Sequence, residues 1–493
     1  MTTTLCLLNF FCLLAVQDTR RETITPAPNV LLIMADDFRP EAGCYGSPAL
    51  TPNLDRLARR SLLFAHAYCQ QAVCNPSRSS LLTGRRPDSL RIWNNSVHFR
   101  ERNPDIQTIP LWFKSHGYHT RCIGKIFHNW HTKVQGDPQS WSVPEFLHYA
   151  NHGDDRALTD GPLPANLART TSGFGYSGPG ICECRDVPDS AYYDGRVADE
   201  AVRAIRNSPD QPFFLAVGFW KPHAQFNAPK KYWDLYDRSK LPQLLNTRPS
   251  NAPDIAFHQS TEVLGPANNQ KTPDTSQVEE MRHGYFANIS YMDAQLGKVL
   301  DALAESPAAS STVVVFLSDH GYHIGEHSLW GKTSNFEYDA RVPLMIHAPG
   351  MKHPGHQTHA ITELIDLFPT LTDLCQLPQP PGLEGQSLTA VLAQPDSPGK
   401  HSALTQHPRP AYYDRTPSGS PATMGYSIRT QLARYTEWRN WKTGAVTDRE
   451  LYLASDQPAE TRNESNNPAH SELRDSLAEL LRQTHPPTAH ESN

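Results

Sequence analysis

Four short, largely apolar runs stand out along the chain, and polar residues follow each of them directly. The runs are rich in β-branched or aromatic residues and are bounded by Gly and Pro. Short continuous runs of this kind predict strands that are buried on both faces, as in a sheet covered by helices. They are Val30–Ala35, His119–Ile123, Phe213–Phe219 and Thr312–Leu317.

Helical patterns alternate with these runs. Thr51 followed by Pro52 predicts a helix start. The N–H groups of the first helical turn have no partner within the helix, and proline has no N–H to leave unpaired there. Tyr291–Leu303 carries apolar residues at helical spacing shortly before the last run. Alternating strands and helices predict an α/β fold, in which ligands bind outside the carboxyl ends of the strands.

The polar residues after the four runs therefore fall at one edge of the predicted sheet. One such cluster alone would be explained by a helix cap or a turn, but four clusters favour a single functional crevice. The residues expected there are Asp36, Asp37, Lys125, His128, His223, Asp319 and His320.

The pattern changes beyond Gln376. A stretch rich in Pro, Gly and Gln follows, and Tyr426–Tyr435 then alternates as a half-buried antiparallel strand does. Ser471–Arg482 predicts a helix in the polar tail. We therefore expect a large α/β domain at residues 26–380 and a smaller C-terminal α+β subdomain at 381–493.

The N-terminus has the features of a secretory signal peptide. Leu5–Val16 is apolar, but it is shorter than the ~20 residues that span a bilayer, so we expect a signal peptide at residues 1–17. No other segment is apolar enough to cross a membrane. The sequence predicts an exported protein, located in a periplasm, outside the cell or in a lysosome-like compartment.

Charge and cysteine content narrow the class of protein further. The chain has 45 Lys and Arg against 51 Asp and Glu, and no basic run exceeds two residues. This distribution lacks the basic stripe of a nucleic-acid binder, so we expect no nucleic-acid partner. The chain has nine cysteines, two of them in the predicted signal peptide, and spacing alone leaves the pairing of the others open.

The most specific motif is Cys74-Asn75-Pro76-Ser77-Arg78, followed by Leu82-Thr83-Gly84-Arg85. Pro76 favours a helix start, which places Cys74 just before a helix N-terminus, where a thiolate and a bound oxyanion are both stabilised. Arg78 falls one turn into that helix and could donate to the same oxygens. A cysteine-phosphatase loop is excluded, because it needs a longer, glycine-closed loop between its Cys and Arg.

This motif is the signature of the formylglycine-dependent (type I) sulfatases, and the chain resembles that family over roughly residues 28–460. The resemblance implies an alkaline-phosphatase-like fold with a large mixed, mostly parallel sheet flanked by helices, and it makes 26–380 the catalytic domain. The flanking motifs are most similar to the iduronate-2-sulfatase branch. They are Leu81–Asp88, Gly124–His128, Phe213–Gly218, Lys221–His223, Ser318–Gly321 and Gly325–His327.

The resemblance also implies a metal site. The family's metal ligands correspond to Asp36, Asp37, Asp319 and His320, together with an oxygen of the modified Cys74. Three carboxylates suit a hard cation, although a histidine would equally admit manganese or zinc. The resemblance, rather than the ligand chemistry, implies one Ca²⁺ per chain.

The family mechanism assigns a role to each remaining residue. A maturation enzyme oxidises Cys74 to formylglycine before folding, and one hydroxyl of the hydrated aldehyde attacks sulfur. Lys125, Lys332 and Arg78 offset the charge on the sulfate oxygens. His223 protonates the leaving oxygen, and His128 takes the proton of the second hydroxyl, which expels sulfate.

The expected substrate is a sulfated oligosaccharide or polysaccharide, as in glycosaminoglycan degradation. A phosphate or phosphonate monoester hydrolase on the same scaffold is the alternative, since some of these enzymes share the Cys74 motif. A non-catalytic sulfoglycan-binding protein is disfavoured, because every expected catalytic position is filled.

Overall fold

The structure is a computed structural model. It describes residues 27–128, 136–146, 182–245, 247–265, 270, 272–411 and 421–487, so the predicted signal peptide at 1–17 lies outside the described residues. Within the described part, none of the helices combines the length and apolar content needed to cross a bilayer. All seven cysteines in that part are free thiols.

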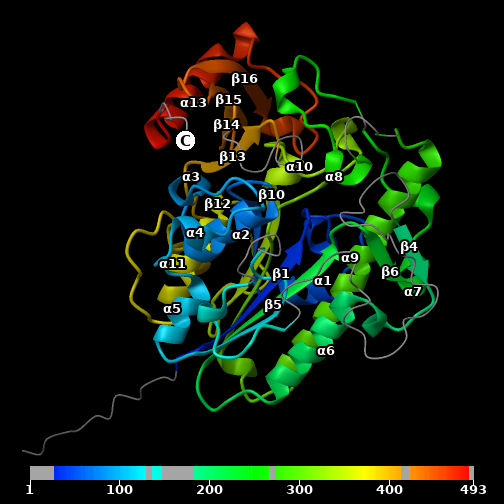
Figure 1. Ribbon diagram of the computed structural model, residues 1–493, viewed down its shortest axis with the longest axis vertical. Coiled ribbons are helices and arrows are strands. Elements are labelled where there is room, and N and C mark those ends of the chain that lie inside the picture. The colour runs from blue at the N-terminus through cyan, green and yellow to red at the C-terminus, as the bar shows by residue number, and fades with distance from the viewer. Residues whose placement is uncertain are drawn as a thin grey trace, which may run out of the picture.

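A large mixed sheet forms the centre of the molecule (Figure 1). Its eight described strands have the order β11-β2-β10-β7-β1-β5-β3, with β12 beside β2. Within this sheet only β10 runs antiparallel to its neighbours. The bounds are β1 Asn29–Asp36, β2 Leu62–Tyr68, β3 His119–Gly124, β5 Phe213–Pro222, β7 Thr312–Ser318, β10 Arg341–His347, β11 Gln357–Thr358 and β12 Thr362–Glu363.

Helices cover both faces of this sheet. Leu31 and Ile33 of β1 pack in one core with α6 and α9, which lie side by side on one face (Figure 1). Val30 and Leu32 pack in a second core with α2, α5 and α11 on the other face. The helices are α1 Pro52–Ala58, α2 Cys74–Thr83, α3 Pro87–Leu90, α4 Phe99–Arg102, α5 Ile109–Ser115, α6 Tyr193–Arg206, α7 Lys230–Trp233, α8 Thr261–Leu264, α9 Thr275–Ala304, α10 Glu337–Ala340, α11 Leu367–Leu374, α12 Thr389–Ala393 and α13 Ser471–Thr484.

The four predicted strands are confirmed as β1, β3, β5 and β7. They are adjacent in the order β3-β5-β1-β7, and all three pairings are parallel. Their carboxyl ends therefore meet at one edge of the sheet, as the sequence predicted, and the alkaline-phosphatase-like arrangement of sheet and helices is confirmed.

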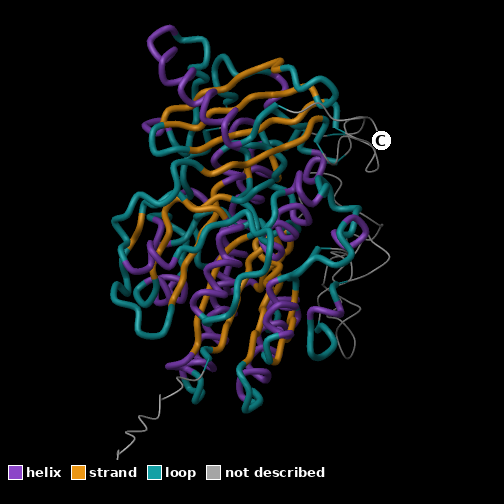
Figure 2. The backbone as a smooth tube through the Cα atoms, turned by 90° about the vertical axis from the view of Figure 1, so that its left-hand side faces the viewer, coloured by secondary structure: helices purple, strands orange, loops and turns teal. Residues whose placement is uncertain are grey.

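A second sheet of four antiparallel strands, in the order β13-β14-β15-β16, is formed by the C-terminal part of the chain (Figure 2). The helix α13 packs on it through Leu477 and Leu481. The prediction of a single strand at Tyr426–Tyr435 is wrong, because the chain turns back at Thr430, whose N–H donates to the Ala433 carbonyl. Its strands are β13 Ala403–Arg409, β14 Thr423–Arg429, β15 Ala433–Asn440 and β16 Val446–Leu453.

Two small pairings lie outside these sheets. Strand β4 (Cys182–Arg185) pairs with β6 (Phe226–Pro229), and β8 (His323–Ile324) pairs with β9 (Trp330–Gly331). The β8–β9 pair follows β7 directly, so it continues from the sheet edge at which the predicted polar residues lie.

Candidate active site

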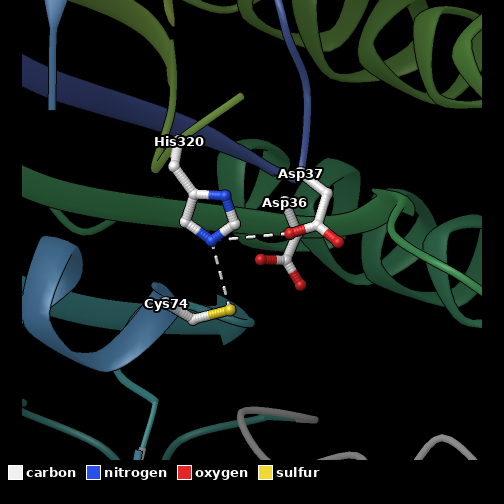
Figure 3. A group of neighbouring side chains, drawn as sticks. All are labelled: Asp36, Asp37, Cys74 and His320. Carbon is white, nitrogen blue, oxygen red and sulfur yellow. Dashed lines mark hydrogen bonds and ion pairs between the residues drawn. The ribbon is translucent and has the colours of Figure 1, made fainter. Parts of the chain in front are cut away.

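Cys74 is the first residue of α2 and Val73 is the cap, so the helix begins earlier than the sequence predicted, which placed Cys74 just before it. Its side chain is only 1% exposed. The sulfur lies 3.4 Å from Nε2 of His320 and 3.8 Å from Nζ of Lys125. Figure 3 shows the His320 ring reaching between Cys74 and the pair Asp36 and Asp37, so residues from α2, from the end of β1 and from the segment after β7 converge here.

The expected thiolate is not what the structure favours. Burial raises the pKa of the Cys74 thiol to about 12, although Lys125 and Lys332 act in the opposite direction. The loss of solvation therefore outweighs both the neighbouring cations and the helix start. An unmodified Cys74 is a neutral thiol in this setting.

Asp36 is the last residue of β1 and Asp37 follows it, and the pKa values of the two carboxyl groups are shifted in opposite directions. Burial opposes ionisation of Asp36, but the ion pairs with Lys125 and Arg78 outweigh it and lower the pKa. Burial raises the pKa of Asp37, although Lys332 and His320 act in the opposite direction. The charged form of Asp37 is thus less well stabilised by its neighbours than that of Asp36, so a further cation would stabilise it more.

Arg78 is fully buried and binds protein acceptors with all three of its guanidinium nitrogens. Its Nε lies 2.7 Å from Asp319, one terminal nitrogen lies 3.0 Å from Asp36, and the other donates to the Lys125 carbonyl at 2.7 Å. Arg78 therefore orients two carboxylates. A contact between Arg78 and a sulfate oxygen would have to replace one of these bonds and stays a prediction.

Four of the predicted metal-binding side chains are close enough to share one ion. Each of Asp36, Asp37, Cys74 and His320 offers a ligand atom, and these atoms lie within 4.8 Å of one another. Asp319 lies 3.6 Å from His320 Nε2, and its oxygens accept from Arg78 and from the N–H groups of Asp37 and His320. Asp319 as a ligand stays a prediction.

Lys332 and His223 form the other side of the site, together with a residue that sequence reasoning missed. Nζ of Lys332 lies 3.0 Å from both oxygens of Asp37 and 3.1 Å from Nε2 of His223. It also donates to Oε1 of Glu262 at 2.6 Å. Glu262 belongs to the four-residue helix α8 and to none of the motifs, so no pattern in the sequence singled it out.

The two predicted proton-transfer histidines are both buried. His223 follows β5, and its Nδ1 is bonded to the Ala224 carbonyl, so Nε2 is the nitrogen that faces Lys332. His128 lies shortly after the end of β3 and is 4% exposed. The roles of both residues stay predictions.

The sequence is similar to that of known proteins over most of its length. The sulfatase family model matches residues 28–377, and the model for the C-terminal part of N-sulphoglucosamine sulphohydrolase matches residues 325–486. The chain is 34% identical to iduronate 2-sulfatase of Mus musculus, over 96% of this chain and 97% of that one. It is 32% identical to the Homo sapiens iduronate 2-sulfatase, over 92% and 94%.

Solved structures share the fold. A protein in complex with its substrate D-glucosamine-2-N,6-O-disulfate superposes with a TM-score of 0.71 at 20% identity, covering 93% of this chain and 97% of that one. The phosphonate monoester hydrolase of Agrobacterium radiobacter gives a TM-score of 0.72 at 22% identity, covering 92% and 95%.

The fold and the family model together show that the chain belongs to the sulfatase family. It is a sulfuric ester hydrolase, and its similarity to the iduronate 2-sulfatases extends over nearly its whole length.

Proposed function

We propose that this sulfatase hydrolyses an O-sulfate ester of a sulfated carbohydrate, and that the substrate is a 2-O-sulfated uronic acid of the iduronate type. The observation that carries the first part is the convergence of Cys74, Lys125 and His320 at the carboxyl edge of the sheet. The similarity to two iduronate 2-sulfatases over more than nine-tenths of the chain supports the second part. The predicted signal peptide supports export.

The nucleophile in this proposal is formylglycine made from Cys74. The neutral thiol is a weak nucleophile, so the position needs another reactive group. Once formed and hydrated, formylglycine supplies the hydroxyl that attacks sulfur and a second hydroxyl through which sulfate is released. Since Cys74 is only 1% exposed in the folded chain, its oxidation by a maturation enzyme has to precede folding.

The side chains present fit a divalent cation. Four buried carboxyl groups face three buried basic side chains, so the possible negative charges in the site exceed the positive ones by one. A divalent cation would reverse that excess and favour an anionic ester. The carboxylates are Asp36, Asp37, Glu262 and Asp319, and the cations are Arg78, Lys125 and Lys332.

Asp36, Asp37 and His320 would hold this cation, which we propose is Ca²⁺, beside position 74. When bound, it supplies electrophilic polarisation of the nucleophile and of the sulfate oxygens. Arg78 keeps Asp36 and Asp319 oriented, and Lys125 is positioned between Asp36 and residue 74.

The chain's own residues supply the charge and the protons for the rest of the reaction. Lys332 offsets negative charge that grows on the sulfate oxygens, because its ammonium is fixed and excluded from water. His223 presents Nε2 as the proton donor to the leaving sugar oxygen, and His128 acts as the base for sulfate release.

A phosphate or phosphonate monoester hydrolase is the second candidate, because the phosphonate monoester hydrolase of Agrobacterium radiobacter has the same fold. Comparing kcat/KM for p-nitrophenyl sulfate and p-nitrophenyl phosphate separates the two. We expect a preference for the sulfate ester, and a preference for the phosphate ester would contradict the proposal. Faster hydrolysis of a 2-O-sulfated uronate disaccharide than of a 6-O-sulfated glucosamine would then support the iduronate-type substrate.

A further inference from the structure

The ammonium of Lys332 sits inside a second group of potential metal ligands. Asp37, His223 and Glu262 have ligand atoms within 4.8 Å of one another, and all three side chains are buried. Nζ of Lys332 contacts each of them, at 3.0, 3.1 and 2.6 Å. A protein cation therefore occupies the position that a second metal ion would take in this group.

The segment that contains Glu262 contacts the segment that leads into Lys332. The hydroxyl of Ser260, just before α8, accepts from the Trp330 N–H at 2.9 Å, which fixes α8 against β9. A Cβ at Gly331 would lie 3.4 Å from Oε2 of Glu262, so the carboxylate lies close to the chain that leads into Lys332. Glu262 and Lys332 are 70 residues apart in the chain, yet their side chains meet in the site.

Oε2 of Glu262 is buried and has no hydrogen-bond partner among the residues that the structure describes, whereas Oε1 binds Lys332 at 2.6 Å. A buried carboxylate that leaves one oxygen unsatisfied is costly, since ionic groups lose solvation on burial. Packing alone does not account for a carboxylate at this position, because an apolar side chain of similar volume would avoid the cost.

We propose that Glu262 is a positioning residue for Lys332. This inference rests on the proposed function, in which Asp37 binds a divalent cation and Lys332 acts on the sulfate group. Without Glu262, the ammonium would depend more on Asp37, and the ammonium and the metal would compete for the same two oxygens. Glu262 takes the ammonium at 2.6 Å, so Asp37 can share its charge with the metal while Lys332 stays beside His223.

The test uses the purified, mature enzyme and Glu262→Gln, which removes the charge and keeps the shape. Because residues that support a metal ligand and a catalytic group are worth about ten- to hundredfold, we expect kcat for p-nitrophenyl sulfate to fall by that factor, with KM within about threefold. Affinity for Ca²⁺, measured by calorimetry on metal-free protein, should weaken by about tenfold.

Glu363→Gln is the matched control. Glu363 is also buried and accepts a hydrogen bond from a lysine, Lys400, at 2.6 Å. Its partners Lys400 and Arg86 lie outside the candidate active site. This variant should lose stability and keep wild-type kcat and Ca²⁺ affinity in its folded fraction. Glu262→Asp keeps the charge but is too short to hold the ammonium at the same place, so its kcat should lie between wild type and Glu262→Gln.

Wild-type kcat and Ca²⁺ affinity in Glu262→Gln would overturn the inference, and so would a loss of thermal stability alone. If Glu262→Gln does not fold, Glu262→Asp decides, since unchanged kcat per folded molecule in that variant contradicts a positioning role. A wild-type enzyme without activity on any sulfate ester would instead contradict the proposed function, so the two failures are distinguishable.

Discussion

Cys74 lies at the N-terminus of α2, which attracts anions, and inside a buried site that excludes water. The helix start and Lys125 favour negative charge on the side chain, but burial raises the pKa of the thiol to about 12. The surrounding groups are therefore suited to oxygen atoms that carry charge during the reaction rather than to a resting thiolate. This is the setting that an oxygen nucleophile at position 74 requires.

Replacing Cys74 tests this directly. Cys74→Ala should lower kcat by at least about a thousandfold, because the nucleophile is lost, while the free energy of unfolding changes by no more than about 1.5 kcal/mol. Cys69→Ala is the control, since Cys69 is equally buried and has no role in the proposed chemistry. Steady-state turnover and urea unfolding would be measured on both, and retained turnover in Cys74→Ala would contradict the assignment.

The metal assignment predicts a change in stability as well as in activity. Binding to the buried carboxylates should raise the free energy of unfolding by about 2.7 kcal/mol at a Ca²⁺ concentration about 100 times Kd. Thermal melts of EDTA-treated protein, with and without added Ca²⁺, would measure this. The rise should vanish in Asp37→Asn, and an EDTA-treated wild type with unchanged melting and turnover would show that no such ion is held.

At the scale of elements, the strand ends were predictable and the long-range partners were not. The four apolar runs gave the adjacent strands β3, β5, β1 and β7, because a strand buried on both faces has a continuous apolar sequence. Glu262 was missed because its contact with Lys332 depends on the folding of two distant loops.

Two of the secondary-structure predictions were wrong for physical reasons. The helix predicted from Tyr291 begins at Thr275. Its first half was missed because α9 is buried around most of its circumference there, so the sequence lacks the amphipathic pattern of a surface helix. The turn between β14 and β15 was missed because Thr430–Leu432 contains no Gly, Pro or Asn, and the alternation of the two strands continues through it.

The close approach of β5 to β3 gives a prediction for an element. A Cβ at Gly218 would overlap the carbonyl oxygen of Lys125, whose N–H donates to the Gly218 carbonyl at 2.9 Å. Gly218→Ala should therefore cost about 1–3 kcal/mol of stability and displace Lys125, lowering kcat by about tenfold or more.

Gly425→Ala provides the comparison. Its Cβ would lie 2.6 Å from the Trp438 ring in the C-terminal sheet, so it should lower stability by a similar amount without changing kcat. Urea unfolding and turnover of the two variants would show the contrast. Equal losses of kcat in both would mean that the approach of β5 does not position Lys125.

At the scale of the whole molecule, buried polar contacts connect the two sheets. His323 bonds to Asp339 at 2.7 Å and to His327 at 3.2 Å, and Nε2 of His327 bonds to the Ala459 carbonyl beyond β16. Glu460 pairs with Arg434 of β15 at 2.6 Å. The C-terminal sheet is thus attached beside the β8–β9 pair that leads to the active site. The boundary at residue 380 stays a prediction.

Because His327 is one of these contacts, the free energy of unfolding depends on pH. Burial, followed by His323, lowers the pKa of His327 from 6.5 to about 4. Above pH 6.5 both the folded and the unfolded states are neutral at His327 and its contribution is fully present. As the pH falls from 6.5 towards 4, only the unfolded chain takes up the proton, so stability is lost.

The loss attributable to His327 should be about 2 kcal/mol between pH 7 and pH 5, as measured by urea unfolding. The glutamine in His327→Gln cannot titrate. The free energy of unfolding of this variant should therefore fall by about 2 kcal/mol less than that of the wild type between pH 7 and pH 5. An identical pH dependence in wild type and variant would show that His327 is protonated equally in both states.

The most direct test of the proposed function is mass spectrometry of residue 74 in protein isolated from its native host. Trypsin would release Ser61–Arg78, which contains both Cys69 and Cys74, so Cys69 serves as an internal control for alkylation. We expect a peptide in which Cys69 is alkylated and residue 74 has the lower mass of an aldehyde. A peptide alkylated at both cysteines, from enzyme that hydrolyses sulfate esters, would contradict the formylglycine mechanism.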